Sequence, residues 1–400
     1  MSDSTDSVPS QGGRAGATRA ATAATWTDET TGARVHRLTD ALSHSHHLYF
    51  PQSGWFDDGS KLVFGSDRGG APNLHVYDFD RDEVTRLTDF PRPTADIRVN
   101  VSMGMGASVN PEREEAYCWH DRTLLAVDLE TCDVRPIHAV DDGQSPLRTS
   151  VAADGAAIYT GVTEGRADID ASTETFEASP HSAVLRVPLD GGDPETIHEI
   201  DRWLGHVNAA PTRPELLTVA HEGPWEAVEQ RIWGIDADTG EVWPVREQTP
   251  EEGIGHEHWI PDAERVGYHG FDADGSPFYG HVRYDDTDRV EVSLPTATVA
   301  VGAHGDQSHF HGRDETLAVS DGTEDLPYCL LWRVDPETET VQGPRVLCRH
   351  DGSFRHQKTH VHPRFGPGGR VLFTTDHSEY GNVHVVDTPD FESLPALDAI

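Results

Sequence analysis

The chain has 400 residues, 36% of them hydrophobic, and carries 69 acidic against 31 basic side chains, a net charge of −38. This acidity argues against a nucleic-acid partner, and no segment reaches the ~18 consecutive apolar residues of a membrane-spanning helix, which argues against a membrane partner. Lysine occurs only at Lys61 and Lys358. An acidic, lysine-poor surface is typical of halophilic proteins, because salt screens charges within about 3 Å at 1 M.

The first segment, residues 1–31, is rich in Ser, Thr, Ala, Asp and Gly. It lacks the apolar stretch of a secretory signal, so we expect a disordered acidic tail. We expect residues 32–400 to form one domain. The cysteines are widely spaced and form no CxxC pair, which predicts reduced thiols and a cytoplasmic location; they are Cys118, Cys132, Cys329 and Cys348.

A strand-rich repeat follows along the rest of the chain. Its clearest copies are Ser53–Asp89 and His360–Asp387. Each consists of a strand, an Asp/Gly or Gly/Gly turn, a β-branched strand, a Gly/Asn loop and a strand that ends in Asp. Several strands in each unit of roughly 40–50 residues predict a β-propeller, and with five weaker copies the all-β fold has seven blades. Arg34–Asp40 resembles Val84–Asp89, so we expect it to complete the last blade and close the ring.

One position recurs in each repeat, five residues ahead of its first turn. Equal register in a closed ring means an equal place around the axis. Imidazoles at four of the seven positions should therefore converge on a metal site or an imidazole-lined pocket. A single buried histidine is more often a hydrogen-bonded core residue, but four in one register favour a functional site. The seven residues are Gln52, Gly106, Arg148, His206, His256, His309 and His362.

The last repeat holds the densest polar cluster. His360 and His362 are one residue apart, so in a strand both side chains point to the same side. Gln357 lies just before them, and His309 comes from the neighbouring repeat. Imidazole nitrogens with an amide oxygen and no thiolate suit Mn²⁺ or another divalent ion, with zinc as an alternative. His311 competes with His309 as a ligand, but the register favours His309.

Several polar motifs resemble those of the oligogalacturonate lyases, a family of seven-bladed propellers that act in pectin degradation. The resemblance extends from about Thr31 over nearly the whole chain. The motifs are Thr31–Asp40, His47–Phe50, His221-Glu-Gly-Pro-Trp225 followed by Gln230–Trp233, His256-Glu-His-Trp259, Ser308-His309 and Gln357-x-x-His360-x-His362-Pro363.

The resemblance implies a reaction and a role for each site residue. Short oligogalacturonates, above all digalacturonate, would be split by β-elimination into 5-keto-4-deoxyuronate-type products. Mn²⁺ on the substrate carboxylate would acidify the C5 proton, and a neutral imidazole would remove it. The implied base is His256, with Arg231 as its charged partner. The implied Mn²⁺ ligands are His309, Gln357, His360 and His362. We expect the substrate pocket to include His206, His221, Arg148 and His258, although the family tends to carry a bulky aromatic or apolar residue at the last of these positions.

Two other functions remain open from the sequence. A non-catalytic TolB-like propeller would bind a sugar or a protein partner and would need no base opposite a metal. A metal-dependent glycoside hydrolase would need an acid for the leaving group, and the ring register contains no paired carboxylates. Substitution of His256 separates the first alternative from a lyase, and the product masses separate the second.

Overall fold

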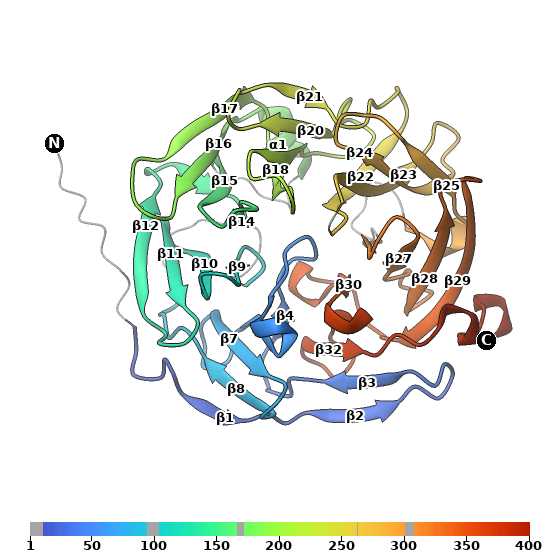
Figure 1. Cartoon of the computed structure of the whole chain (residues 1–400), viewed down its shortest axis with the longest axis horizontal. Helices are drawn as coiled ribbons and strands as arrows, with labels where there is room; N and C mark the ends of the chain where they lie inside the picture. The colour runs from blue at the N-terminus through green and yellow to red at the C-terminus, as the bar shows by residue number, and fades with distance from the viewer. Residues whose placement is uncertain (1–10, 94–103, 166–171, 262, 301–307) are drawn as a thin grey trace.

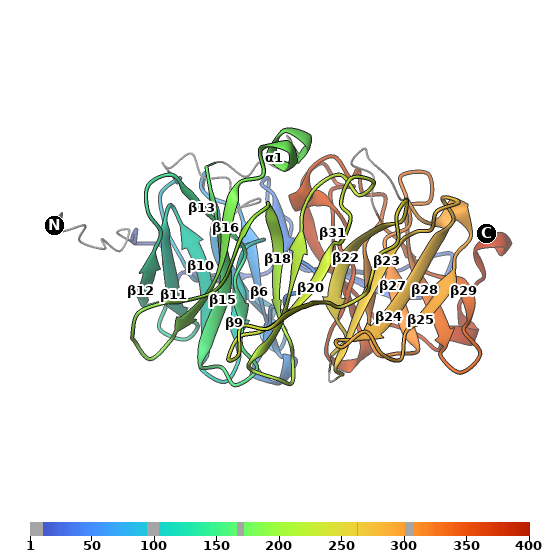
Figure 2. The same ribbon diagram turned by 90° about the horizontal axis from the view of Figure 1, so that it is seen from above.

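The computed structural model describes residues 11–93, 104–165, 172–261, 263–300 and 308–400. Seven antiparallel sheets surround a central axis (Figure 1), which confirms the predicted seven-bladed β-propeller. The helix α1 (Ser172–Ala178) projects from one face of the ring (Figure 2). No helix within the described ranges is long and apolar enough to cross a membrane.

Blades 1 to 3 come from the first half of the chain, and each extends from the axis to the rim of the ring. From the axis outwards, blade 1 contains β4 (Ser45–His47) and β5 (Trp55–Phe56), then β6 (Lys61–Ser66), β7 (Asn73–Asp78), β8 (Glu83–Arg86) and β1 (Thr18–Ala20). Blade 2 contains β9 (Ser108–Asn110), β10 (Glu115–His120), β11 (Thr123–Asp128) and β12 (Val134–Ala139). Blade 3 contains β13 (Gln144–Pro146) and β14 (Ser150–Val151), then β15 (Ala157–Glu164), β16 (His181–Pro188) and β17 (Glu195–Asp201).

Blades 4 to 7 follow in the same order. Blade 4 contains β18 (Leu204–Ala209), β19 (Leu216–His221), β20 (Ile232–Asp236) and β21 (Val242–Pro244). Blade 5 contains β22 (Gly253–Trp259), β23 (Arg265–Phe271), β24 (Pro277–Arg283) and β25 (Val290–Ser293). Blade 6 contains β26 (Phe310–Gly312), β27 (Leu317–Ser320), β28 (Tyr328–Asp335) and β29 (Thr340–Arg349). Blade 7 contains β30 (Arg364–Phe365), β31 (Val371–Thr375), β32 (Asn382–Val386), β3 (Arg34–Arg37) and β2 (Ala24–Thr27).

Short 3₁₀ turns connect some of these strands. They are η1 (Asp57–Gly59), η3 (Thr296–Thr298), η4 (Gln357–Thr359), η5 (Pro367–Gly369), η6 (Phe391–Ser393) and η7 (Leu397–Ala399).

Thin apolar layers between adjacent blades hold the ring together. Between blades 1 and 2, Leu74 and Val76 of β7 share one buried cluster with Ala116 and Cys118 of β10. A middle strand has a neighbouring blade on each of its faces, so it is buried on both sides. Its sequence is therefore nearly continuously apolar. The modest hydrophobic content is therefore sufficient for the fold.

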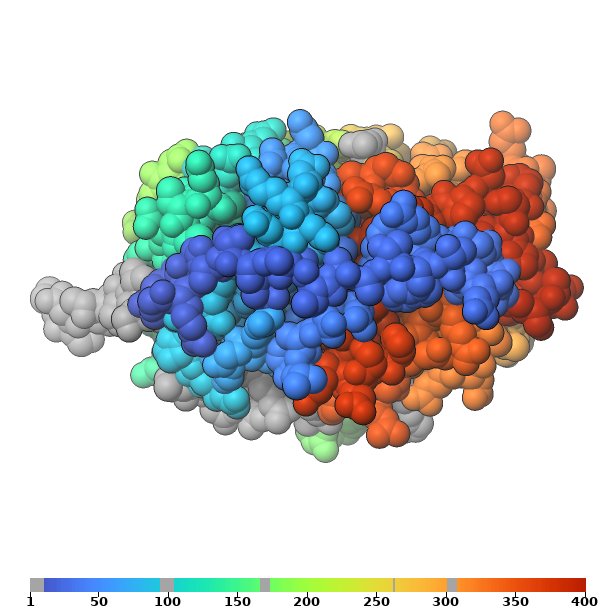
Figure 3. Space-filling view, turned by 90° about the horizontal axis from the view of Figure 1, so that it is seen from below, coloured from blue at the N-terminus to red at the C-terminus, as the bar shows by residue number. Residues whose placement is uncertain are grey.

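The N-terminal segment closes the ring across two blades. As expected, β3 within Arg34–Asp40 completes blade 7 by pairing with β32. The expectation of a disordered tail is wrong from residue 11 onward, because β2 pairs with β3 and β1 pairs with β8 of blade 1. Figure 3 shows this blue segment crossing both blades. Outer strands present unpaired backbone groups, so a polar segment can add to them without an apolar pattern in its sequence. Residues 1–10 lie outside the described part of the chain.

Candidate metal and catalytic site

Four imidazoles from three blades meet near the axis of the ring. The ring centroid of His309 lies 4.1 Å from that of His256, 4.2 Å from that of His362 and 5.7 Å from that of His360. His256 belongs to β22, His309 directly precedes β26, and the other two lie between η4 and β30. Three of the four histidines expected to converge from equal register, His256, His309 and His362, therefore lie together, whereas His206 contacts Tyr49 and Glu257 instead. All four clustered side chains are buried.

The backbone that presents these histidines is irregular. The expected strand through His360 and His362 is wrong, because β30 begins only at Arg364. His362 instead has a left-handed backbone with φ of 45°. His256 is also left-handed, with φ of 52°, where the pairing register of β22 shifts. Such conformations cost about 1–3 kcal/mol each and occur where the surrounding structure enforces them, often at functional sites.

Three of these histidines offer a nitrogen cage for a metal ion. His309, His360 and His362 each place one possible ligand atom within 4.8 Å of the others. Nε2 of His309, Nε2 of His362 and Oε1 of Gln357 are buried without a hydrogen-bond partner among the described residues. Buried lone pairs are normally satisfied. A divalent ion bound here would satisfy them, and a donor set of nitrogen and oxygen fits Mn²⁺.

Hydrogen bonds on the far side of two rings determine which nitrogen faces this cage. Asp321 accepts from Nδ1 of His309 at 2.8 Å and from its backbone N–H at 2.6 Å, which leaves Nε2 with the lone pair. Nε2 of His360 donates to the carbonyl oxygen of Phe354 at 2.6 Å, which leaves its Nδ1 as the acceptor atom. Such partners orient metal-binding imidazoles. Asp321 was not identified from the sequence, although it stands opposite His309 across the β26–β27 hairpin.

His256 is held as a neutral proton acceptor. Its Nδ1 donates to the carbonyl oxygen of Ser308 at 2.8 Å, so Nε2 carries the lone pair. Burial, followed by the neighbouring His309, keeps the pKa of His256 well below its usual value. Trp225 packs edge-on against the ring at 5.5 Å. This packing requires glycine at Gly255, since an added Cβ would lie 2.0 Å from the indole.

Arg231 pairs with two carboxylates. Its Nε donates to Glu257 at 3.1 Å and its Nη1 to Glu222 at 3.0 Å. The other oxygen of Glu257 accepts from Nδ1 of His206 at 2.6 Å. Despite its burial, Glu257 has its pKa lowered to about 2 by His206 and Arg231, so it stays ionised. The sequence motifs contained both glutamates without assigning them a role.

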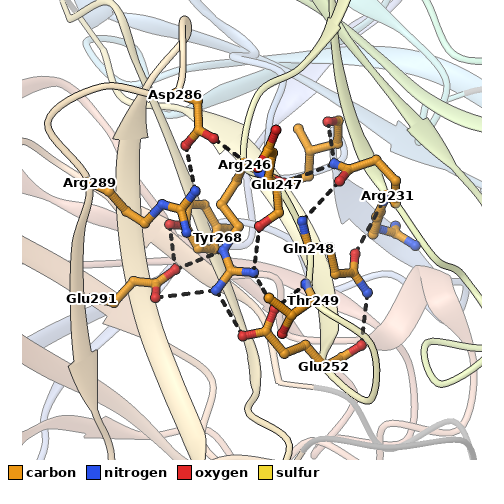
Figure 4. Close-up of polar contacts among 12 residues, drawn as sticks. Arg231, Arg246, Glu247, Gln248, Thr249, Glu252, Tyr268, Asp286, Arg289 and Glu291 are labelled. Carbon is orange, nitrogen blue, oxygen red and sulfur yellow. Dashed lines mark hydrogen bonds and ion pairs between the residues drawn. The ribbon is translucent and has the colours of Figure 1, made fainter.

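A second polar network fixes the backbone behind Arg231 (Figure 4). The backbone N–H of Arg231 donates to Oε1 of Gln248, and Nε2 of Gln248 donates in turn to the carbonyl oxygen of Glu252. Arg246 pairs with the carboxylates of Glu252 and Glu291. Arg231 is thus held at its backbone and at its guanidinium.

Arg148 differs from Arg231 because its charge is uncompensated. Its guanidinium carbon lies 3.8 Å from the ring centroid of Tyr49, and no carboxylate pairs with it among the described residues. The Tyr49 ring in turn contacts His206 and His362 at 5.3 and 5.1 Å. Arg148 therefore brings an unpaired positive charge close to the histidine cluster.

The remaining two predicted substrate contacts lie elsewhere. His258 is completely buried, accepts from the N–H of Gly312 at 2.8 Å and donates to the carbonyl oxygen of His256 at 3.3 Å. With both nitrogens engaged it is not a substrate contact, so that expectation is wrong. The ring of His221 lies 5.1 Å from that of Trp233, tilted by 33°, in a pocket of about 80 Å³. Glu222 also lines this pocket, which therefore adjoins Arg231 rather than the metal cage.

Comparisons with known proteins identify the family of the chain. The family model described as oligogalacturonate lyase matches residues 15–392. The chain is 28% identical over 397 residues to an oligogalacturonide lyase of Pectobacterium atrosepticum and 27% identical over 397 residues to an oligogalacturonate lyase of Dickeya dadantii. Each alignment covers 92% of this chain and 96% of the relative.

Solved structures show the same architecture. An oligogalacturonate lyase in complex with manganese has a TM-score of 0.81 at 25% identity, with 94% of this chain and 98% of that chain covered. An oligogalacturonate lyase from Vibrio parahaemolyticus has a TM-score of 0.79 at 23% identity, with 94% and 99% covered. Since the family model spans most of the chain, the protein belongs to the oligogalacturonate lyase family.

Proposed function

We propose that this protein cleaves short oligogalacturonates, above all digalacturonate, by metal-dependent β-elimination, and yields 5-keto-4-deoxyuronate-type products. The observation that carries this proposal is the stacking of His256 on His309, which puts a neutral proton acceptor beside a metal-ligand candidate. The relatives named above support the substrate class.

Proton abstraction falls to His256. Its Nε2 carries the lone pair, because Nδ1–H is held by the Ser308 carbonyl oxygen. Elimination begins with removal of the C5 proton, which is weakly acidic because C5 lies next to a carboxylate. A base of lowered pKa stays unprotonated at neutral pH and is always ready to accept, although it is a weaker base than a free imidazole.

The carboxylate next to C5 needs a cationic partner. We assign metal binding to His309, Gln357, His360 and His362, and Mn²⁺ held there would supply Lewis-acid polarisation of that carboxylate. Arg148 has an unpaired guanidinium and can bind a substrate carboxylate through two parallel hydrogen bonds. Arg231 cannot use its Nε in this way, since Glu257 occupies it. We therefore propose that Arg231 orders Glu257 and His206 and adds positive charge to the pocket.

Elimination fits the two carboxylates around Arg231 better than hydrolysis does. A hydrolase needs a protonated acid for the leaving group. Glu257 is ionised, with its pKa lowered to about 2, and Glu222 is paired with Arg231. Neither can donate a proton at neutral pH.

Mass spectrometry of digalacturonate incubated with the protein tests this proposal, with Mn²⁺ in one arm and a chelator in the other. Products whose masses add up to that of the substrate, formed only with metal and lost in His256→Ala, would support elimination. Products heavier by one water would establish hydrolysis instead. Unchanged substrate affinity in His256→Ala without any turnover would favour a binding propeller.

We also propose that the protein works in the cytoplasm of a cell with concentrated salt. The four cysteines are buried and unbridged in the described structure, as suits a reducing compartment. The net charge of −38 suits concentrated salt.

A further inference from the structure

The central channel contains a further cavity, of about 280 Å³, beyond the histidine cluster. The last residues of β9, β18 and β22 line it, together with Arg364 at the start of β30. Along β18, His206 contacts the site described above, whereas Asn208, two residues further on, lines the cavity. The cavity therefore lies at the end of the channel where the innermost strands of these blades finish.

Phe50 separates this cavity from the candidate metal cage. The loop after β4 extends into the centre of the ring (Figure 1). The fully buried ring of Phe50 lies 5.7 Å from that of His309 and 6.2 Å from those of His256 and His362. On its other side, the carbonyl oxygen of Phe50 accepts from Nη1 of Arg364 at 2.5 Å. One residue thus contacts the histidines through its ring and Arg364 through its backbone.

The buried arginines of the described chain differ in how their charge is compensated. Arg86, Arg231 and Arg246 each pair with one or two carboxylates. Arg148 has no carboxylate but lies over the Tyr49 ring. Within the described residues Arg364 has neither, and its one hydrogen bond there goes to the Phe50 carbonyl oxygen.

An uncompensated buried charge is costly, since the guanidinium loses its hydration without gaining a counter-charge. Arg364 is 9% exposed, and its Nε has no hydrogen-bond partner among the described residues. The chain has 69 acidic residues, yet none of those in the described ranges pairs with Arg364. A ligand that brings the negative charge explains why no side chain does.

The polar lining of the cavity also favours an anion. Nδ2 of Asn208 is a buried donor without a partner in the described chain. The side-chain amide of Gln52, which also lines the cavity, donates to the hydroxyl of Ser150 at 3.2 Å. Among the described residues, Glu112 is the one acidic residue that lines the cavity. Guanidinium and amide donors together match the two oxygens of a carboxylate.

We propose that this cavity is a second ligand site, distinct from the metal site, which binds a small carboxylate through Arg364 with Asn208 as an additional donor. Pockets for small molecules measure about 300–1,000 Å³, and this cavity of about 280 Å³ is close to the small end of that range. It therefore has room for a ligand as large as a single sugar acid. Simple carboxylates and sugar acids share the recognised group.

Crystals of the full-length, Mn²⁺-loaded protein soaked separately with galacturonate, acetate and bromide would test the proposal. Galacturonate has no glycosidic bond to cleave, and bromide is located by its anomalous scattering. We expect carboxylate density against Arg364 with galacturonate. Acetate density at the same place would mean that a carboxylate alone is sufficient for binding. Galacturonate density without acetate density would mean that the site also recognises the sugar ring. Bromide alone, or no density for any probe, would overturn the proposal.

Calorimetric titration with galacturonate gives the matching solution test. We expect affinity at this site to fall at least ~10-fold in Arg364→Gln, as loss of a charge-assisted hydrogen bond implies. Arg148→Gln, which removes the other unpaired arginine, is the matched control and should keep this binding event. Because Arg364 follows His362 closely, Mn²⁺ affinity is measured in parallel. Asn208→Ala provides a variant away from the metal ligands and should weaken binding several-fold. Unchanged affinity in both Arg364→Gln and Asn208→Ala would contradict the assignment.

Discussion

The imidazole rings of His256 and His309 stack with their centroids 4.1 Å apart and their planes inclined by 28°. Positive charge on both rings at that separation would be strongly repulsive. His309 has its Nδ1–H on Asp321, and His256 has its Nδ1–H on Ser308. The pair therefore rests as two neutral rings, one arranged to bind a metal ion and the other to accept a proton.

Removing the base should abolish chemistry without removing the metal site. In His256→Ala we expect kcat to fall by about 10²–10⁴-fold, the usual contribution of general base catalysis. Mn²⁺ affinity, measured by titration calorimetry, should change little, because His256 is not among the proposed ligands. A variant that keeps most of its turnover would show that another group takes the proton.

Asp321→Asn should weaken metal binding. The amide can no longer accept both hydrogen bonds of His309 as a carboxylate does, so the ring loses its fixed tautomer. We expect the Kd for Mn²⁺ to rise about 10–100-fold, as followed by the electron paramagnetic resonance of free Mn²⁺. Asp190→Asn, which removes a surface partner of Arg113, is the matched control and should leave the Kd unchanged. Equal affinity in both variants would remove Asp321 from the metal site.

Arg148→Gln should mainly affect substrate binding. A charge-assisted pair contributes about 1.5–3 kcal/mol, so we expect kcat/KM for digalacturonate to fall about 10–100-fold, chiefly through a higher KM. Arg148→Lys should restore part of the loss, since the charge remains but the fork geometry does not. An unchanged KM in Arg148→Gln would place the substrate carboxylate elsewhere.

Buried histidines away from the metal site should make the fold sensitive to mild acid. Burial lowers the pKa of His75 and of His384 from 6.5 to about 3. The unfolded chain therefore binds more protons than the folded one below pH 6.5, and the free energy of unfolding should fall as pH drops from 6.5 toward 3. Thermal unfolding across this range measures the effect.

A pair of variants isolates that contribution. His384→Phe should make Tm less dependent on pH. His181 is exposed, and its pKa is raised by hydrogen bonding to Asp201, so its stabilising contribution is present below pH 6.5 and lost above. His181→Gln should therefore not reduce the acid sensitivity. The same pH profile in His384→Phe as in the unaltered protein would contradict this account.

Salt should stabilise the protein markedly. With a net charge of −38, repulsion between carboxylates opposes the compact state. The Debye length falls from about 10 Å at 0.1 M to about 3 Å at 1 M, so Tm should rise over that range of KCl. NaCl at the same ionic strength should reproduce the rise, because screening depends on ionic strength. A Tm that is independent of KCl would argue against adaptation to concentrated salt.

The sequence by itself determined the repeat and therefore the ring. The period of the strands predicted seven blades, because each blade must bury both faces against similar neighbours. Equal register predicted that His256, His309 and His362 would meet, because the closed ring converts sequence register into position around one axis. The closing strand at Arg34–Asp40 was predictable because it repeats the pattern of another blade end.

Only the tertiary structure decided what each side chain does at the meeting point. The tautomers depend on Asp321 and on the carbonyl oxygens of Ser308 and Phe354, and a carbonyl group is present at every residue and so leaves no mark in the sequence. His258 belongs to the same motif as His256, yet its two nitrogens bond the N–H of Gly312 and the carbonyl oxygen of His256. The unpaired charge of Arg364 likewise became visible only once its neighbours in space were known. Such roles depend on which groups the closed ring brings together, and one chain read in order does not contain that information.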